Sequence, residues 1–249
     1  MSSKARKGVG RLHRAARALR GLDHQPPAPP STAVGAIDWG ALRTVTPISD
    51  DYGVDRGSPI DRYYIEGFLE RHSQDIRGRV LEIHDGRYAR RFGGDRVQRL
   101  DVLHAGPGNP EATIEADLTD APQIPDGMFD CVICTQTLMF IYDVPAAIRT
   151  LERILAPGGA ALVTVSCVSR ICQPEMEIWG DWWRFTSKSA RRLFEQSFPE
   201  ESVQVESHGN VLAGVSMLYG IAAEELTESE LDHADRNFEV LLAVRAQSS

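Results

Sequence analysis

The sequence has few cysteines and no long apolar run. Four cysteines among 249 residues are too few for a disulfide scaffold of this size. No stretch approaches the ~18 consecutive apolar residues that a membrane-spanning helix needs. The basic N-terminus is not followed by the apolar run and cleavage site of a secretory signal peptide. We therefore expect a cytoplasmic protein, with a chain long enough to form one large domain.

Two of the cysteines, Cys131 and Cys134, have CxxC spacing but lie within the apolar run FDCVICTQTL. Such a run predicts a buried strand, in which residues three apart point to opposite faces. A zinc or redox site would need a turn here and a second pair of ligands. We therefore interpret both cysteines as core residues. The sequence offers no metal-binding constellation, and we expect no metal.

Basic residues are scarce outside the N-terminus. Residues 1–20 carry seven Lys or Arg and no acid, which leaves 20 basic and 35 acidic residues, a net charge of −15, for the remaining chain. Such an acidic body disfavours a nucleic-acid partner. The basic segment, residues 4–20, has apolar positions on one helical face that suit weak contact with an anionic membrane surface. A solvated tail is the simpler interpretation.

A proline-rich stretch, QPPAPPSTA at residues 25–33, separates the basic segment from the rest of the chain. Proline-rich stretches form extended linkers. We therefore place the domain boundary near residue 36. Residues 1–35 are the tail and linker, and residues 36–249 are one domain.

Beyond the linker, apolar runs alternate with segments of helical periodicity. Strands are predicted over residues 79–83, 97–103, 112–118, 129–135, 160–165, 203–208 and 238–246, and helices over 59–71, 145–155 and 187–198. This alternation predicts an α/β fold with a mostly parallel sheet, helices on both faces and an antiparallel hairpin of the last two strands at the edge. Such sheets bind ligands outside the carboxyl ends of their strands, near the switch in strand order.

The run FDCVICTQTLMFIYDVPAAIRTLERILAPGGAALVTVS resembles the second half of a class I methyltransferase domain. In that family a strand is followed by a helix, then by R-x-L-x-P-G-G and another strand. The resemblance covers roughly residues 55–245. It implies a Rossmann-like fold with a seven-stranded sheet, and S-adenosylmethionine as the cofactor.

The resemblance also assigns cofactor-binding roles to single residues. Glu82 matches the acid that opens and orients the loop after the first strand. Asp101, which follows Leu100, matches the acid that binds the two ribose hydroxyls. Asp117 and Leu118 match the pair that meets the adenine, and Gln136 lies where the fourth strand opens toward the methyl group. Taken singly, such an aspartate is more often a helix cap or a turn residue than a ligand contact, and Asp101 and Asp117 favour the second interpretation because they occur together.

The loop after the first strand departs from the family pattern, acid-x-Gly-x-Gly-x-Gly. Aligned on Glu82, the chain has His84, Gly86 and Tyr88, so only the middle glycine remains. Glycine is favoured there because a side chain hinders close approach to a ligand and restricts positive φ. The side chains of His84 and Tyr88 therefore either reshape the pocket or remove cofactor binding.

Two further segments are candidates for ligand contact. Before the first strand, Arg56 is placed to reach the methionine carboxylate of the cofactor, and Tyr63 to stack or hydrogen-bond nearby. The alternative is that the tyrosines of this helix pack on the core.

After the fifth strand, Trp179, Asp181 and Arg184 combine aromatic faces with charge in a way that suits a sugar. The WRFT segment here resembles bacterial methyltransferases grouped with polysaccharide and cell-envelope genes. The alternative, which we favour for Trp183, is an apolar anchor for the next helix, with Thr186 as its N-cap.

The function expected from these features is metal-independent transfer of a methyl group to a hydroxyl of a small molecule or glycan. The alternative is a catalytically silent relative that serves as a binding or assembly module. His208 and Asp181 are candidate bases by residue type alone, so no base is assigned. A nicotinamide-dependent oxidoreductase would carry G-x-G-x-x-G after the first strand, which is absent. The sequence does not indicate an oligomeric state.

Overall fold

The computed structural model describes residues 32–249, and the chain divides into two units, Met1–Thr44 and Val45–Ser249. In the first unit, the described residues 32–44 are mostly exposed and contain one 3₁₀ turn, Gly40–Leu42. The second unit holds the sheet and its covering helices. The boundary near residue 36 and the membrane contact of residues 4–20 stay predictions, and the latter lies outside the described residues.

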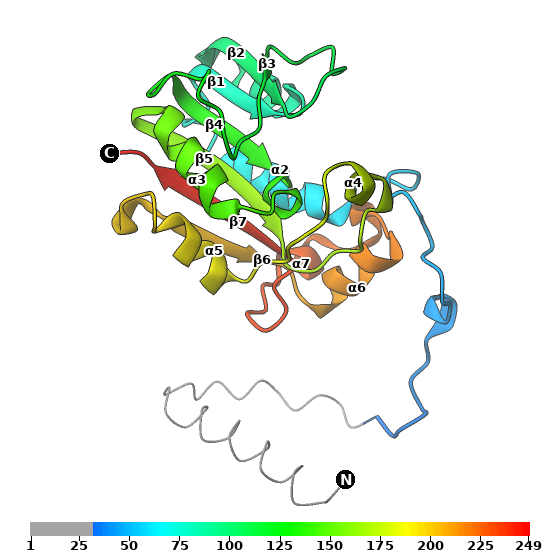
Figure 1. The fold of residues 1–249 in the computed structure, drawn as a ribbon. Helices are drawn as coiled ribbons and strands as arrows, with labels where there is room; N and C mark the ends of the chain where they lie inside the picture. The colour runs from blue at the N-terminus through cyan, green and yellow to red at the C-terminus, as the bar shows by residue number, and fades with distance from the viewer. Residues whose placement is uncertain (1–31) are drawn as a thin grey trace, which may run out of the picture. The chain divides into compact units, whose positions relative to one another are not determined.

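The second unit is built on a seven-stranded sheet with the order β3-β2-β1-β4-β5-β7-β6 (Figure 1). The strands are β1 Gly78–Ile83, β2 Val97–His104, β3 Ile114–Glu115, β4 Phe129–Thr135, β5 Leu155–Ser166, β6 Gln204–His208 and β7 Leu241–Gln247. The pairs from β3 to β5 are parallel, and β7 runs antiparallel to both β5 and β6. The predicted mostly parallel, seven-stranded sheet with an antiparallel edge is confirmed.

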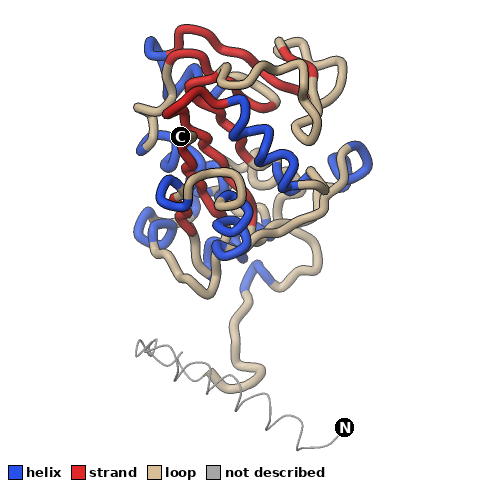
Figure 2. The backbone as a smooth tube through the Cα atoms, turned by 60° about the vertical axis from the view of Figure 1, so that its left-hand side comes forward, coloured by secondary structure: helices blue, strands red, loops and turns tan. Residues whose placement is uncertain are grey.

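Helices cover both faces of this sheet (Figure 2). They are α2 Ile60–Arg71, α3 Val144–Ile154, α4 Gln173–Ile178, α5 Ser187–Phe194, α6 Val211–Tyr219 and α7 Glu228–Asp232, together with a π-helix at Ala89–Gly93 and short 3₁₀ turns at Gly94–Arg96, Leu138–Phe140, Glu200–Ser202 and Ala223–Glu225. The chain between β6 and β7 forms α6 and α7, which the sequence patterns did not predict. Thr186 caps α5 as expected, because its Oγ1 accepts from the Ser189 N–H at 3.2 Å.

The central strands are apolar on both faces because a helix layer covers each of them. On one face, α3 and α5 pack on β4, β5 and β7, and on the other α2 and the π-helix pack on β1 and β4. Cys131 and Cys134 illustrate the alternation, since each is fully buried but they belong to opposite layers of the core. Both are free thiols, and burial raises the pKa of Cys134 to about 12. Their interpretation as core residues is confirmed.

The P-G-G segment after α3 differs from the prediction. Residues 157–159 were expected to form a turn before a strand at 160–165, but β5 begins directly at Leu155 and includes them. A register shift between Phe129 and Cys131 of β4 accommodates the extra residues. Gly159 lies against the neighbouring backbone, where an added Cβ would stand 2.9–3.1 Å from the carbonyl oxygens of Ala156, Phe129 and Asp130. This bulge therefore requires glycine.

Among the described residues, no helix is both long and apolar enough to cross a membrane.

We expect Gly159→Ala to lower the free energy of unfolding by about 1–3 kcal/mol, because its Cβ would overlap three backbone oxygens that cannot move independently. The matched control is Gly67→Ala within α2, where the nearest atom to the new Cβ is the Arg71 Nη1 at 3.5 Å. That change should stabilise the protein by about 0.5–1 kcal/mol. Urea unfolding midpoints measure both, and shifts in the same direction would contradict this account of the bulge.

Candidate functional site

A cleft of about 930 Å³ opens at the carboxyl ends of the parallel strands, where β1 and β4 meet at the switch in strand order. Its walls come from the ends of β1, β2, β4 and β5, the segment after β3, the start of α2 and residues 169–184. Of the predicted site residues, it is lined by Glu82, Asp117, Leu118, Gln136, Trp179, Asp181 and Arg184. Four other predicted residues do not line the cleft: Gly86, Asp101, Arg56 and Tyr63.

Glu82 organises the turn that follows β1. Its side chain is 2% exposed, and its carboxylate accepts from the N–H groups of Tyr88 at 3.1 Å and Ala89 at 2.8 Å. These donors begin the π-helix at Ala89 and would otherwise lack partners. Burial raises the pKa of the Glu82 carboxyl to about 7, against the opposing effect of the two hydrogen bonds. Glu82 therefore holds this loop through direct contact with its backbone, and its part in cofactor binding stays a prediction.

The loop keeps a glycine-like backbone at one position where glycine is missing. His84 has φ of +79°, the region that favours glycine. Tyr88, by contrast, has φ of −75°, so glycine is not needed there. Gly86 packs against β2, since an added Cβ would stand 2.7 Å from the Leu100 Cδ2. Of the two positions where the chain lacks the family's glycine, only His84 therefore has a backbone conformation that favours glycine.

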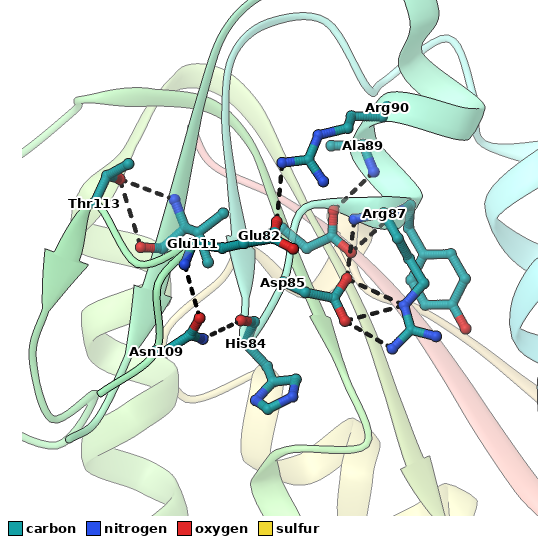
Figure 3. A network of polar contacts seen from close by, with 11 residues as sticks. Glu82, His84, Asp85, Arg87, Ala89, Arg90, Asn109, Glu111 and Thr113 are labelled. Carbon is teal, nitrogen blue, oxygen red and sulfur yellow. Dashed lines mark hydrogen bonds and ion pairs between the residues drawn. The ribbon is translucent and has the colours of Figure 1, made fainter. Parts of the chain in front are cut away.

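The strained backbone at His84 is held from two sides. Its N–H donates to the Leu103 carbonyl at 2.8 Å. Its own carbonyl accepts from the Asn109 Nδ2 at 2.5 Å (Figure 3). Arg90 forms an ion pair with Glu111 at 2.9 Å, which connects the start of the π-helix to the loop after β2. Asn109 and Glu111, both in the loop between β2 and β3, thus hold a turn that glycine would adopt without strain.

The structure places Asp101 in the interior of its strand and not at the cleft, where the resemblance expects an acid that binds the ribose hydroxyls. β2 continues to His104, so Asp101 lies inside the sheet, paired in register with Leu81. Its carboxylate is 3% exposed and accepts from the Arg79 Nε at 2.8 Å and from the Thr113 Oγ1 at 3.1 Å. Asp101 therefore stabilises the sheet and does not line the cleft.

The residue at the end of β2 is His104. Its Nδ1 lies 2.6 Å from the Gly106 carbonyl oxygen and 3.3 Å from the Gly106 N–H. The shorter contact favours a proton on Nδ1, and in that tautomer Nε2 is an acceptor. The rings of His84 and Trp179 flank it at centroid distances of 5.6 and 5.7 Å. His104 was not among the predicted site residues, because the predicted strand over residues 97–103 ends one residue before it.

Asp117 and Leu118 follow β3 and line the cleft as expected. The Asp117 Oδ1 accepts from both the N–H and the Oγ1 of Thr119 at 2.8 Å, which fixes the carboxylate in a tight turn. Leu118 is 3% exposed and forms part of the core beneath it. The pair offers one carboxylate edge beside an apolar surface.

Arg56 and Tyr63 are positioned away from the cleft, contrary to their predicted placement. Arg56 pairs with Glu225 through two hydrogen bonds of 2.9 and 2.6 Å. The Tyr63 hydroxyl donates to Asp232 at 2.9 Å, and its side chain lines a separate, smaller cavity. The residues of this segment that do line the cleft are Asp61 and Arg62 at the start of α2.

Asp61 and Arg62 bring opposite charges to the same wall of the cleft. Burial raises the pKa of Asp61, whose carboxylate accepts from the neighbouring N–H of Arg62 at 2.8 Å. Within residues 32–249, no side chain forms an ion pair with the Arg62 guanidinium. Arg62 was missed because the helical pattern places several arginines on this segment and does not show which acid each one meets.

The chain was compared with known proteins. A family model described as a methyltransferase domain matches residues 79–163. A SAM-dependent methyltransferase from Archaeoglobus fulgidus has a similar structure, with 12% identity, coverage of 75% of this chain and 94% of that chain, and a TM-score of 0.51. The chain has the class I methyltransferase fold. This confirms the resemblance found in the sequence.

Two further methyltransferases share this fold. NodS, an N-methyltransferase from Bradyrhizobium japonicum WM9 in complex with S-adenosyl-L-homocysteine, has 14% identity, coverage of 80% of this chain and 93% of that chain, and a TM-score of 0.50. An S-adenosylmethionine-dependent methyltransferase from Mesorhizobium loti has 16% identity, coverage of 78% and 100%, and a TM-score of 0.50. The sequence matches no curated protein significantly.

On this methyltransferase fold, residues 169–184 form the outer wall of the cleft. Asp181 and Arg184 both line it, but they pair with each other at 2.5 Å, and this contact holds the pKa of Asp181 below its usual range. Arg184 also donates to the Arg170 carbonyl at 2.9 Å. The pair therefore shapes the segment, while the exposed faces of Trp179 and Trp182 remain available to a ligand.

Glu82 makes the stability of this domain depend on pH. Its pKa in the folded protein, about 7, lies above the ordinary value of 4.5, so folding favours the protonated form. Its stabilising contribution is complete below the unfolded pKa and is lost as the pH rises through about 7. Between about pH 5 and pH 8 the free energy of unfolding should therefore fall by up to about 3 kcal/mol more in the wild type than in Glu82→Gln.

Urea unfolding at the two pH values measures this difference. The matched control is Glu201→Gln, an exposed carboxylate, which should retain the wild-type pH dependence. Equal pH dependence of the wild type and Glu82→Gln would show that the carboxylate of Glu82 is already ionised at low pH.

Proposed function

We propose that the chain is an S-adenosylmethionine-dependent methyltransferase that methylates a hydroxyl of a small-molecule or glycan acceptor in the cytoplasm. The observation that carries the proposal is that the loop after β1, the end of β2 and the segment after β3 all face one cleft of a methyltransferase fold. The acidic body is the reason to expect no nucleic acid as the acceptor.

The residues of the cleft fit the cofactor chemically. Asp117 and Leu118 offer a hydrogen-bond acceptor beside an apolar surface, which suits an adenine with its exocyclic amine. The His104 Nε2 is the free acceptor at the end of β2, which suits a ribose hydroxyl. Asp61 and Arg62 offer a carboxylate and a guanidinium to the ammonium and carboxylate of the methionine end.

The size of the cleft suits two ligands. About 930 Å³ lies at the upper end of ligand-pocket volumes, roughly 300–1,000 Å³. When bound, S-adenosylmethionine supplies a methyl group on a sulfonium, so that the acceptor oxygen gains the methyl carbon while the sulfur keeps the electron pair. The protein then has to orient the acceptor, exclude water and receive the hydroxyl proton.

We infer that neither His208 nor Asp181, the two candidates by residue type, receives this proton. His208 lines the smaller cavity and stacks on Tyr64. Asp181 is held in its ion pair with Arg184. The ionisable side chains that line the cleft without an ion pair include both histidines, His84 and His104, and we leave the base unassigned.

A silent binding module is the second candidate function. It is favoured by His84, whose side chain occupies a position where glycine would let a ligand approach the backbone closely. It predicts a folded protein that binds neither S-adenosylmethionine nor S-adenosylhomocysteine.

We expect Arg62→Gln to weaken S-adenosylhomocysteine binding about tenfold or more, because it removes a charge-assisted hydrogen bond to the methionine carboxylate. Binding of 5′-methylthioadenosine, which lacks that carboxylate, should change by less than about twofold. Calorimetric titration measures both ligands. Arg56→Gln is the matched control, since Arg56 pairs with Glu225 away from the cleft, and should bind as the wild type does.

The possible results separate the two candidate functions. Loss of affinity for both ligands in Arg62→Gln would contradict the assignment of Arg62 to the methionine end. Absence of binding by the wild-type protein at millimolar ligand would overturn the methyltransferase proposal in favour of the silent module.

A further inference from the structure

Two nitrogen atoms buried in residues of the cleft wall have hydrogens to donate and no acceptor. Within residues 32–249, three buried side-chain polar atoms lack a hydrogen-bond partner: Gln136 Nε2, Arg170 Nε and His208 Nε2. Gln136 and Arg170 line the cleft, and His208 lines the smaller cavity. Because buried polar atoms are nearly always hydrogen-bonded, unpaired donors on a cleft wall indicate the chemistry of what binds there.

Gln136 follows β4, and its amide orientation is set by the protein. Its Oε1 accepts from the Ser166 hydroxyl at 3.0 Å, and its backbone N–H donates to the Thr164 carbonyl at 2.9 Å. Ser166 is 3% exposed, so its hydroxyl depends on this acceptor. The amide NH₂ of Gln136 is therefore the end without a partner. Its backbone is also held at a φ of +48°, which a non-glycine residue adopts at a cost that often marks functional sites.

Arg170 follows β5, the strand that neighbours β4. Its guanidinium lies 3.9 Å from the centroid of the Tyr52 ring, and its Nη2 donates to the Asp50 carbonyl. Among the described residues, Arg170 forms an ion pair with Asp50 alone, at 3.8 Å, and Asp50 is 91% exposed, which leaves much of the positive charge uncompensated. Tyr52 itself has φ of +53° and lines the cleft.

Both unpaired atoms are donors, and one belongs to a cation. The ligand that satisfies them must bring oxygen acceptors and negative charge. The cofactor's own carboxylate has a separate partner in the proposed function, the guanidinium of Arg62 on α2. Beside this wall, the exposed rings of Tyr142 and Trp182 lie 5.2 Å apart and provide an aromatic surface for a small cyclic ligand.

We propose that the methyl acceptor is a small hydroxy acid, whose carboxylate receives a hydrogen bond from the Gln136 Nε2 and the positive charge of Arg170. This inference rests on the proposed function and narrows its acceptor class. Gln136, to which the resemblance assigns a cofactor-binding role near the methyl group, instead holds the acceptor together with Arg170 in this proposal. Both are then specificity-determining residues, and the methylated hydroxyl belongs to the same molecule as the carboxylate.

The test uses the full chain saturated with S-adenosylhomocysteine and two matched pairs of probes, 4-hydroxybenzoate with 4-hydroxybenzamide and glucuronate with glucose. Calorimetry and thermal shift measure their binding. We expect the acid of at least one pair to bind about tenfold more tightly than its neutral partner. Gln136→Glu replaces the donor by a repelling carboxylate, and Arg170→Gln removes the charge, so each should abolish that preference.

Two controls accompany these variants. Arg149→Gln removes an exposed arginine of α3 that lies outside the cleft, and it should keep the wild-type preference for the acid. The affinity for S-adenosylhomocysteine, measured on every variant, should stay within about twofold of the wild-type value, which also shows that the variants fold.

Three results would overturn the inference. The first is equal binding of acid and neutral partner, and the second is no binding of any acid at millimolar concentration. The third is a tenfold loss of S-adenosylhomocysteine affinity in Gln136→Glu or Arg170→Gln, which would assign these donors to the cofactor. Failure of the wild type to bind S-adenosylhomocysteine would instead overturn the proposed function, and titration of the acids without it still tests the carboxylate site.

Discussion

The cleft depends on one buried interaction, the carboxylate of Glu82 with the N–H groups of Tyr88 and Ala89. A buried carboxylate is unfavourable by itself, and its raised pKa reflects that cost. The two backbone donors offset part of it, because they lie at the start of a helix and have no other partners. This contact sets where the chain turns after β1. The position of His84, and with it the floor of the cleft, follows from that turn.

Local strain is concentrated on the walls of the same cleft. Among the described residues, the non-glycine residues with positive φ are Tyr52, His84 and Gln136, and all three line it. They come from the segment before α2, the end of β1 and the end of β4. Such conformations persist only where the surrounding structure holds them, and here the well-packed central sheet does so. The strained residues and the unpaired donors of Gln136 and Arg170 all belong to the wall of this cleft, which is the physical reason to treat it as the functional site.

The regular core could be predicted because its pattern is local. β4 runs over Phe129–Thr135 as predicted, since a strand buried on both faces leaves a continuous apolar run. The role of Asp101 was harder to predict. Asp101 is an acid inside a strand, and the ion pair with Arg79 that makes this tolerable joins residues of two different strands. Without that partner in view, the acid was matched to the residue that binds the ribose hydroxyls in the methyltransferase family.

The sequence alone determined the fold class, the layer order of the core, the burial of the two cysteines and the cap of α5. Each of these follows from apolar periodicity or from side chains a few residues apart. Only the tertiary structure decided which charged and aromatic side chains reach the cleft. Arg56 and Tyr63 each form a hydrogen bond with an acid 169 residues away, which holds them outside the cleft. The ring of Trp179 contacts the ring of His104, a residue of a different element. Which polar side chains pair depends on their distance in the folded protein, and the apolar periodicity of the sequence carries no information about that distance.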